Sequence, residues 1–164
     1  MLDVDKVAKN IYLKTPGILK KLKGLFGDEI FSAGGNLIFK SLADRVFSSK
    51  TDLKKLNRLM FPLIRNEVKN ILNKSQGRSY IIIDAAILFD CKLDLFCDCV
   101  ILVNTSSQRR KTFLKNEGFS DNDVKLRMEG QHIKVNERKV NFIIRNDNSK
   151  RNLLDKVKKI LKNI

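Results

Sequence analysis

The chain has 164 residues, with 33 Lys and Arg against 18 Asp and Glu, so its formal net charge is +15 with the one His neutral. A hydrophobic content of 43% is too high for a disordered chain, and the length suits one compact domain. The sequence excludes a membrane span, which needs roughly 20 apolar residues, and the acidic start of the chain argues against a secretory leader.

The first half of the sequence is predicted to be helical. Apolar residues at helical spacing predict helices over residues 6–13, 18–26, 37–47 and 53–72. Thr15-Pro16-Gly17 is expected to break the chain after the first helix, and Gly27 to end the second. Thr51 is the predicted N-cap of the fourth helix, and Pro62 is expected to kink it.

The second half alternates predicted strands with helices. Apolar runs predict strands over residues 80–83, 99–103 and 141–144. Continuous β-branched runs of this kind are typical of parallel strands that are covered on both faces. Helices are predicted over 106–116 and 121–130, and an apolar stripe from Leu153 to Ile164 predicts a terminal helix that packs on the sheet rather than on a membrane. The alternation indicates the α/β class.

The three cysteines, Cys91, Cys97 and Cys99, have the spacing C-x5-C-x-C. With a single His in the chain, a closed four-ligand zinc site is hard to build from them. We interpret them as buried, reduced thiols, and a metal or redox site is the alternative. Reduced thiols indicate a reducing compartment, most simply the cytoplasm.

Acidic residues stand where two predicted strands end. Asp84 directly follows the apolar run 81–83, and Asp3 and Asp5 flank Val4 in what reads as a short strand entering a helix. Ligands of open parallel sheets bind beyond the carboxyl ends of the strands. A carboxylate there can accept a hydroxyl proton or hold Mg²⁺, and the alternative is a helix cap or a surface turn.

Basic side chains gather between the second and third predicted strands. They are Arg109, Arg110, Lys111, Lys115, Lys125, Arg127, Lys134, Arg138 and Lys139. Lys111 and Lys115 lie four apart on one helix face, as do Arg127 and Gln131. Cations on a helical flap can clamp a moving phosphoryl group, and the alternative is a solvated face. The 164 residues contain no G-x-x-x-x-G-K-[ST] segment, and His132 has no nucleophile at a recognisable spacing.

Seven segments, read in order, resemble motifs of the dephospho-CoA kinase family of P-loop kinases. Leu2-Asp3-Val4-Asp5-Lys6-Val7-Ala8 is similar to I-D-A-D-x-[IV]-A, and Asp84-Ala85-Ala86-Ile87-Leu88-Phe89-Asp90 is similar to D-x-P-L-L-F-E. The other segments are residues 26–30, 42–47, 56–64, 111–131 with its R-x-x-x-Q ending, and 143–146. Lys111 and Lys115 stand where the family has Arg, which keeps the charge without the bidentate geometry.

The resemblance implies a three-layer fold in which helices flank a parallel sheet. It implies one kinase-like domain over 1–164, with a core at about 1–104 and 140–164 and a lid-like helical stretch at about 105–139. The family begins with a strand and a G-x-x-G-x-G-K-S loop that precede the segment matched here at residue 2. We therefore expect this chain to lack both.

The resemblance also implies ATP-dependent phosphorylation of the ribose 3′-hydroxyl of dephospho-CoA, the last step of coenzyme A synthesis, with ATP and Mg²⁺ as cofactors and no metal site of the protein's own. Asp5 is then the general base. The implied substrate-binding residues are Asp3, Asp84, Leu88 and Asp90. The implied nucleotide-binding residues are Lys111, Lys115, Arg127 and Gln131.

Two other functions stay open. Without a phosphate loop the chain could be inactive alone or a non-catalytic relic that keeps a substrate or partner surface. The net charge of +15 would also suit a basic nucleic-acid-binding module. Nucleic acid is the weaker alternative, because the sequence shows no basic face interleaved with stacking aromatic residues.

Overall fold

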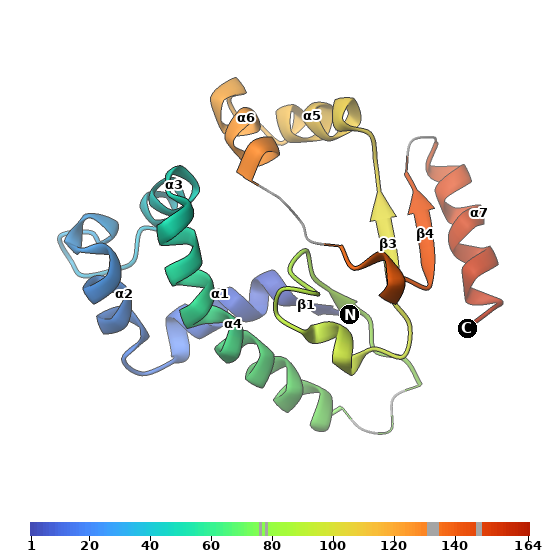
Figure 1. Cartoon of the computed structure of the whole chain (residues 1–164), viewed down its shortest axis with the longest axis horizontal. Helices are drawn as coiled ribbons and strands as arrows, with labels where there is room; N and C mark the ends of the chain where they lie inside the picture. Colours follow the sequence, from blue (N-terminus) through green and yellow to red (C-terminus); the bar gives the residue numbers. More distant parts are fainter. Residues whose placement is uncertain (76, 78, 131–134, 147–148) are drawn as a thin grey trace. The chain divides into compact units, whose positions relative to one another are not determined.

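The computed structural model describes residues 1–75, 77, 79–130, 135–146 and 149–164. The chain divides into two compact units, Met1–Leu93 and Asp94–Ile164. In the described residues each unit contains a pair of parallel strands together with helices, so the predicted α/β class is confirmed (Figure 1). The single domain over 1–164, with its separate core and lid-like stretch, stays a prediction.

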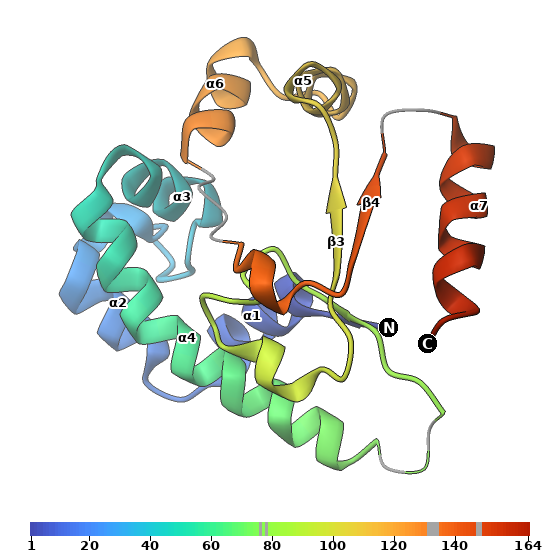
Figure 2. The ribbon, with the colours of Figure 1, turned by 45° about the vertical axis from the view of Figure 1, so that its right-hand side comes forward.

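The first unit is mostly helical. Its elements are β1 (Leu2–Asp3), α1 (Val4–Lys14), α2 (Ile18–Phe26), the short 3-10 helix η1 (Asp28–Ile30), α3 (Phe39–Ser48), α4 (Lys50–Asn73) and β2 (Ile83–Asp84). Helices α1 and α3 pack against the long helix α4, and α2 packs against α1 and α4 (Figures 1 and 2). The expected break at Thr15–Gly17 and the expected end at Gly27 are confirmed.

Apolar residues at helical spacing form the core of this unit. Each helix buries residues that lie three or four positions apart, which places them on one face. The buried set is Val4, Val7 and Ile11 of α1, Ile18, Leu22 and Phe26 of α2, Leu42 and Val46 of α3, and Met60, Ile64 and Val68 of α4. The core therefore follows the apolar stripes of the sequence.

The start of α4 differs from the prediction. Ser49, not Thr51, is the N-cap, because Ser49 has extended backbone angles and its Oγ accepts a hydrogen bond of 3.2 Å from the Asp52 N–H. Thr51 lies inside the first turn. The helix continues through Pro62 from Lys50 to Asn73.

The predicted buried strand over 80–83 is wrong for most of its length. Only Ile83 and Asp84 form β2, whereas Tyr80 is 80% exposed and Ile82 is 64% exposed. A β-branched run becomes a buried strand only where neighbouring strands and covering layers meet it. In the described part of the chain, β2 has β1 as its one strand partner.

The second unit contains the longer strand pair. Its strands are β3 (Ile101–Asn104) and β4 (Phe142–Arg145). Its helices are α5 (Ser107–Asn116), α6 (Asp121–Gly130), the short 3-10 helix η3 (Glu137–Lys139) and α7 (Lys150–Leu161). The 3-10 helix η2 (Leu93–Phe96) begins at the last residue of the first unit. Strands β3 and β4 pair in parallel from Ile101↔Phe142 to Asn104↔Arg145. Helix α7 packs on β4, as expected (Figure 2).

Two expectations for this unit are wrong. The strand predicted over 99–103 begins at Ile101, so Cys99 precedes it. Val103 and Ile143 are exposed, so these strands are not covered on both faces. The described strands form two separate pairs, not one larger sheet, because no strand joins them by hydrogen bonds. Within the described residues, no helix combines the length and the apolar character needed to cross a bilayer.

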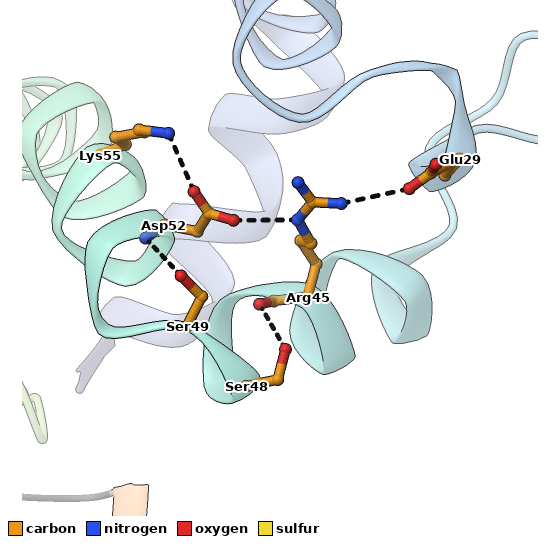
Figure 3. A network of polar contacts seen from close by, with 6 residues as sticks. All are labelled: Glu29, Arg45, Ser48, Ser49, Asp52 and Lys55. Atoms are coloured by element: carbon orange, nitrogen blue, oxygen red, sulfur yellow. Dashed lines mark hydrogen bonds and ion pairs between the residues drawn. The ribbon is translucent and has the colours of Figure 1, made fainter.

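A network of charges joins α3, α4 and η1. Asp52 is 7% exposed, and its carboxylate accepts hydrogen bonds from Arg45 Nε at 2.9 Å and from Lys55 Nζ at 3.0 Å. Arg45 Nη1 also donates to Glu29 Oε2 at 3.2 Å (Figure 3). The hydrogen bond from Arg45, followed by that from Lys55, holds the pKa of Asp52 below its ordinary value of 3.8. The sequence did not predict this network.

We expect Asp52→Asn to lower the midpoint of thermal unfolding at neutral pH by about 5 °C, because the buried carboxylate loses its ionic partners. A depressed native pKa stabilises the fold above the unfolded pKa, and this stabilisation is lost as pH falls through the native pKa. The difference between wild type and variant should therefore shrink below about pH 4.

The matched control is Asp44→Asn, because Asp44 is exposed on α3. The control should unfold like the wild type at every pH. An Asp52→Asn protein as stable as the control would contradict a stabilising role for the network.

Candidate active site

The short strands β1 and β2 bring together acidic residues from distant parts of the chain. The two strands are parallel, with Leu2 opposite Ile83 and Asp3 opposite Asp84. The Leu2 N–H donates to the Ile82 carbonyl at 2.7 Å, and neighbouring strands lie about 4.8 Å apart. Asp3 and Asp84 therefore stand side by side at the carboxyl ends of two strands, where ligands of parallel sheets bind.

Asp3 is the N-cap of α1. Its Oδ1 accepts a 3.0 Å hydrogen bond from the Lys6 N–H and so caps α1, and Lys6 Nζ lies 3.3 Å from its Oδ2. The hydrogen bond from the Lys6 backbone is the main cause that holds the pKa of Asp3 below 3.8. The helix-cap alternative raised by the sequence thus holds for Asp3.

Asp5 differs from Asp3 although it lies only two residues further along. It is exposed in the first turn of α1, where the helix dipole favours a carboxylate. Within the part of the chain that the structure describes, no hydrogen bond or ion pair occupies its carboxylate oxygens. Asp5 is therefore the exposed carboxylate of α1.

The segment after β2 forms a series of tight turns. The Cys91 N–H donates to the Ile87 carbonyl at 2.9 Å, and the Leu93 N–H donates to the Leu88 carbonyl at 2.8 Å. Cys91 and Leu93 are buried and anchor the segment. Asp84 and Asp90 are exposed and Leu88 is half-buried. All these residues belong to the same unit as Asp3 and Asp5.

The predicted nucleotide-binding cations lie in the second unit, on α5 and α6, which we call the cationic hairpin (residues 107–130). Lys111 is exposed on α5. Lys115 Nζ lies 2.7 Å from Asp121 Oδ1, and the Arg127 guanidinium lies 4.1 Å from the centre of the Phe119 ring. Gln131 and His132 fall outside the described residues. The structure brings Asp3, Asp5 and Asp84 together in one unit and the cations together in the other.

Sequence reasoning missed Phe119 and Asp121 as partners of these cations. The signal for them was present in Gly118, which can end one helix, and in Ser120, which can cap the next. The corner that they form is what brings Asp121 near Lys115.

The cysteines are free thiols. Burial is the main cause that raises the pKa of Cys91 to about 12, and burial also raises the pKa of Cys97. Both thiols are therefore poor nucleophiles and weak metal ligands at neutral pH. In the described residues, His, Cys, Asp and Glu form no group of three or more that could hold a metal ion.

Comparisons with known proteins agree with the motif resemblance. The model of the dephospho-CoA kinase family matches residues 1–152. The chain is 28% identical to the dephospho-CoA kinase of Bdellovibrio bacteriovorus over 99% of its own length and 82% of that protein, and 29% identical to that of Arabidopsis thaliana over 98% and 71%. The solved structure of Campylobacter jejuni dephospho-CoA kinase shares the fold, with a TM-score of 0.57 and 22% identity over 99% of this chain and 85% of that one.

These matches place the protein among the kinases, transferases that bind nucleotides. Because the family model covers more than nine-tenths of its residues, the chain belongs to the dephospho-CoA kinase family.

Proposed function

We propose that the protein transfers the γ-phosphoryl group of ATP to the ribose 3′-hydroxyl of dephospho-CoA and so completes coenzyme A. The observation that carries this proposal is the family match over residues 1–152, supported by relatives that bear the name dephospho-CoA kinase. We also propose that the reaction takes place in the cytoplasm, which suits the three free thiols.

In the proposed reaction, Asp5 accepts the proton of the 3′-hydroxyl. The oxygen attacks the γ-phosphorus, a new O–P bond forms, and the bond between that phosphorus and the β–γ bridging oxygen breaks to release ADP. The exposed carboxylate in the first turn of α1 supports this role, because a general base must be within hydrogen-bond reach of the proton that it removes.

Asp3, Asp84, Leu88 and Asp90 are the proposed substrate-binding residues. Asp3 acts mainly by capping α1, which sets the position of Asp5 two residues later. Asp84 stands opposite Asp3 and can accept a hydrogen bond from a ribose hydroxyl. Leu88 and Asp90, on the turns that follow, would contact the rest of the substrate.

Mg²⁺ would come with ATP and balance the charge of its phosphates. Magnesium in kinases is typically held by one or two carboxylates together with substrate phosphates. Asp84, exposed at the end of β2, can supply one such carboxylate, whereas both carboxylate oxygens of Asp3 are engaged by Lys6. A cage made by the protein alone is not part of the proposal.

We propose that Lys111, Lys115 and Arg127 of the cationic hairpin bind the phosphates of the nucleotide. Gln131 stays a fourth predicted nucleotide-binding residue. Cations placed on a transferring phosphoryl group stabilise the charge that it carries in the transition state. The positive charge of α5, which has four basic residues and no acidic one, supports this role. Both lysines act as point charges, whereas Arg127 can bind in a bidentate way.

The proposal is tested by incubating a purified form of the protein that binds ATP with ATP and dephospho-CoA and separating the products. We expect one CoA and one ADP for each ATP consumed, and no transfer to a 3′-deoxy analogue of the substrate. ADP release that does not depend on dephospho-CoA, or phosphate on the analogue, would contradict the proposed function.

Because residues 1–164 contain no G-x-x-x-x-G-K-[ST] segment, we expect them to show no ATP-induced rise in the midpoint of thermal unfolding when expressed alone. The same residues expressed with the codons that precede Met1 in the gene serve as the comparison. ATP at 100 times its dissociation constant stabilises a binding-competent form by about 2.7 kcal/mol. A clear rise in the 164-residue form would mean that other residues bind the phosphates.

A further inference from the structure

The corner between α5 and α6 is held by its backbone. Gly118 has a left-handed φ of 87°, its N–H donates to the Lys115 carbonyl at 3.0 Å, and the Phe119 N–H donates to the Leu114 carbonyl at 3.2 Å. These two bonds form a Schellman motif, which satisfies the last carbonyl groups of α5. The corner is therefore defined by hydrogen bonds and not by the charges near it.

The start of α6 is also fixed by hydrogen bonds. Ser120 Oγ accepts a hydrogen bond from the Asp123 N–H at 3.2 Å, and the Val124 N–H donates to the Ser120 carbonyl at 2.9 Å. Val124 is buried. Asp121 thus lies in the first turn of α6, where the helix dipole favours its negative charge.

This geometry brings the carboxylate of Asp121 into contact with the ammonium group of Lys115, which we propose binds nucleotide. Lys115 Nζ and Asp121 Oδ1 are 2.7 Å apart, while the two side chains remain 57% and 84% exposed. An ion pair so open to water is weak, so a phosphate group can displace the carboxylate. Lys111, four residues earlier on the same face of α5, forms no ion pair within the described residues.

We propose that Asp121 is a built-in competitor of the nucleotide: its carboxylate occupies Lys115 in the ligand-free protein and lowers the affinity of the cationic hairpin for phosphate chains. The inference rests on the proposed function in one respect, that α5 binds nucleotide phosphates. It adds that the strength of this binding is set by an acidic residue of the hairpin itself.

Arg127 is held in a different way. Phe119 presents its ring face to the guanidinium at 4.1 Å. A cation–π contact uses the flat face of the guanidinium and leaves its N–H groups, which lie in the plane, free to donate. Phe119 therefore orients Arg127 without neutralising it, and Asp121 is the residue that competes with phosphate.

The test measures binding of inorganic tripolyphosphate by calorimetry, at low and at high ionic strength, to the same form of the protein as the kinase assay. Asp121→Asn should bind tripolyphosphate about two- to five-fold more tightly, the range expected for an exposed ion pair, and salt should reduce the gain. The matched control is Glu117→Gln, which removes one negative charge from the exposed end of α5. The gain of Asp121→Asn must exceed that of the control.

A double-mutant cycle decides whether the effect passes through Lys115. In a Lys115→Gln background, Asp121→Asn should give no gain beyond that of Glu117→Gln. Equal gains for the two acidic variants, the same gain without Lys115, or tripolyphosphate binding that does not weaken in Lys115→Gln would each overturn the inference. Because dephospho-CoA is absent, the proposed function fails separately, by a lack of product in the kinase assay.

Discussion

Asp5→Asn should lower the turnover of dephospho-CoA by about 10²–10⁴-fold, the usual effect of losing a general base. The assay should use a form of the protein that turns over ATP. Asn keeps the size and most of the polarity of Asp but cannot accept the hydroxyl proton at neutral pH. Because the Asp5 side chain is exposed, the substitution should leave the midpoint of thermal unfolding unchanged.

Asp44→Asn is again the matched control, since it makes the same chemical change at an exposed helical position of the same unit. Its turnover should equal that of the wild type. If Asp5→Asn retained near-normal turnover, another group would have to accept the proton.

Changing Lys111, Lys115 and Arg127 together to Ala should lower kcat/KM for ATP by about 10²–10³-fold, the range seen when groups that stabilise transition-state charge are removed. Lys111 and Lys115 are exposed, and the half-buried Arg127 lies over the ring of Phe119, so the fold should survive. Circular dichroism and thermal unfolding should confirm that survival.

A loss of net charge alone could also weaken ATP use, because the whole chain carries +15. The control therefore changes Lys158, Lys159 and Lys162 to Ala, which removes three exposed cations at the end of α7. That control should change kcat/KM only slightly, and the change should disappear at higher salt. Equal losses in the two triple variants would mean that the cationic hairpin is only a solvated face.

Local signals located the helices but not all of their ends: α3, predicted over 37–47, is Phe39–Ser48. The observed bounds of α2 and α6, Ile18–Phe26 and Asp121–Gly130, agree with the predicted ones. Helix hydrogen bonds join residues four apart, so the stripe and the stop residues lie in one short stretch of sequence. At the start of α4, Ser49 and Thr51 were both plausible caps, and the backbone angles of Ser49 made the difference.

Strands were less predictable, because their partners come from distant sequence. The run from Tyr80 to Ile83 has the sequence of a buried strand. Only Ile83 and Asp84 form a strand, because the partner strand β1 has only two residues to pair with them. The sequence of an apolar run does not determine how long its partner strand is or which elements cover the two faces of the sheet. The parallel direction of both pairs agrees with the apolar character of the runs.

The candidate site shows the same division. Its residue types, the acids near strand ends and the cations of residues 107–130, could be recognised in the sequence because they are a matter of composition and spacing. Asp3 lies beside Asp84 only because β1 pairs with β2, which is some eighty residues away in the sequence. Asp3 differs from the exposed Asp5 because its side chain caps α1 with a hydrogen bond. The partner of Lys115 likewise depends on a backbone turn at Gly118, because contact between side chains requires their backbones to be brought together first.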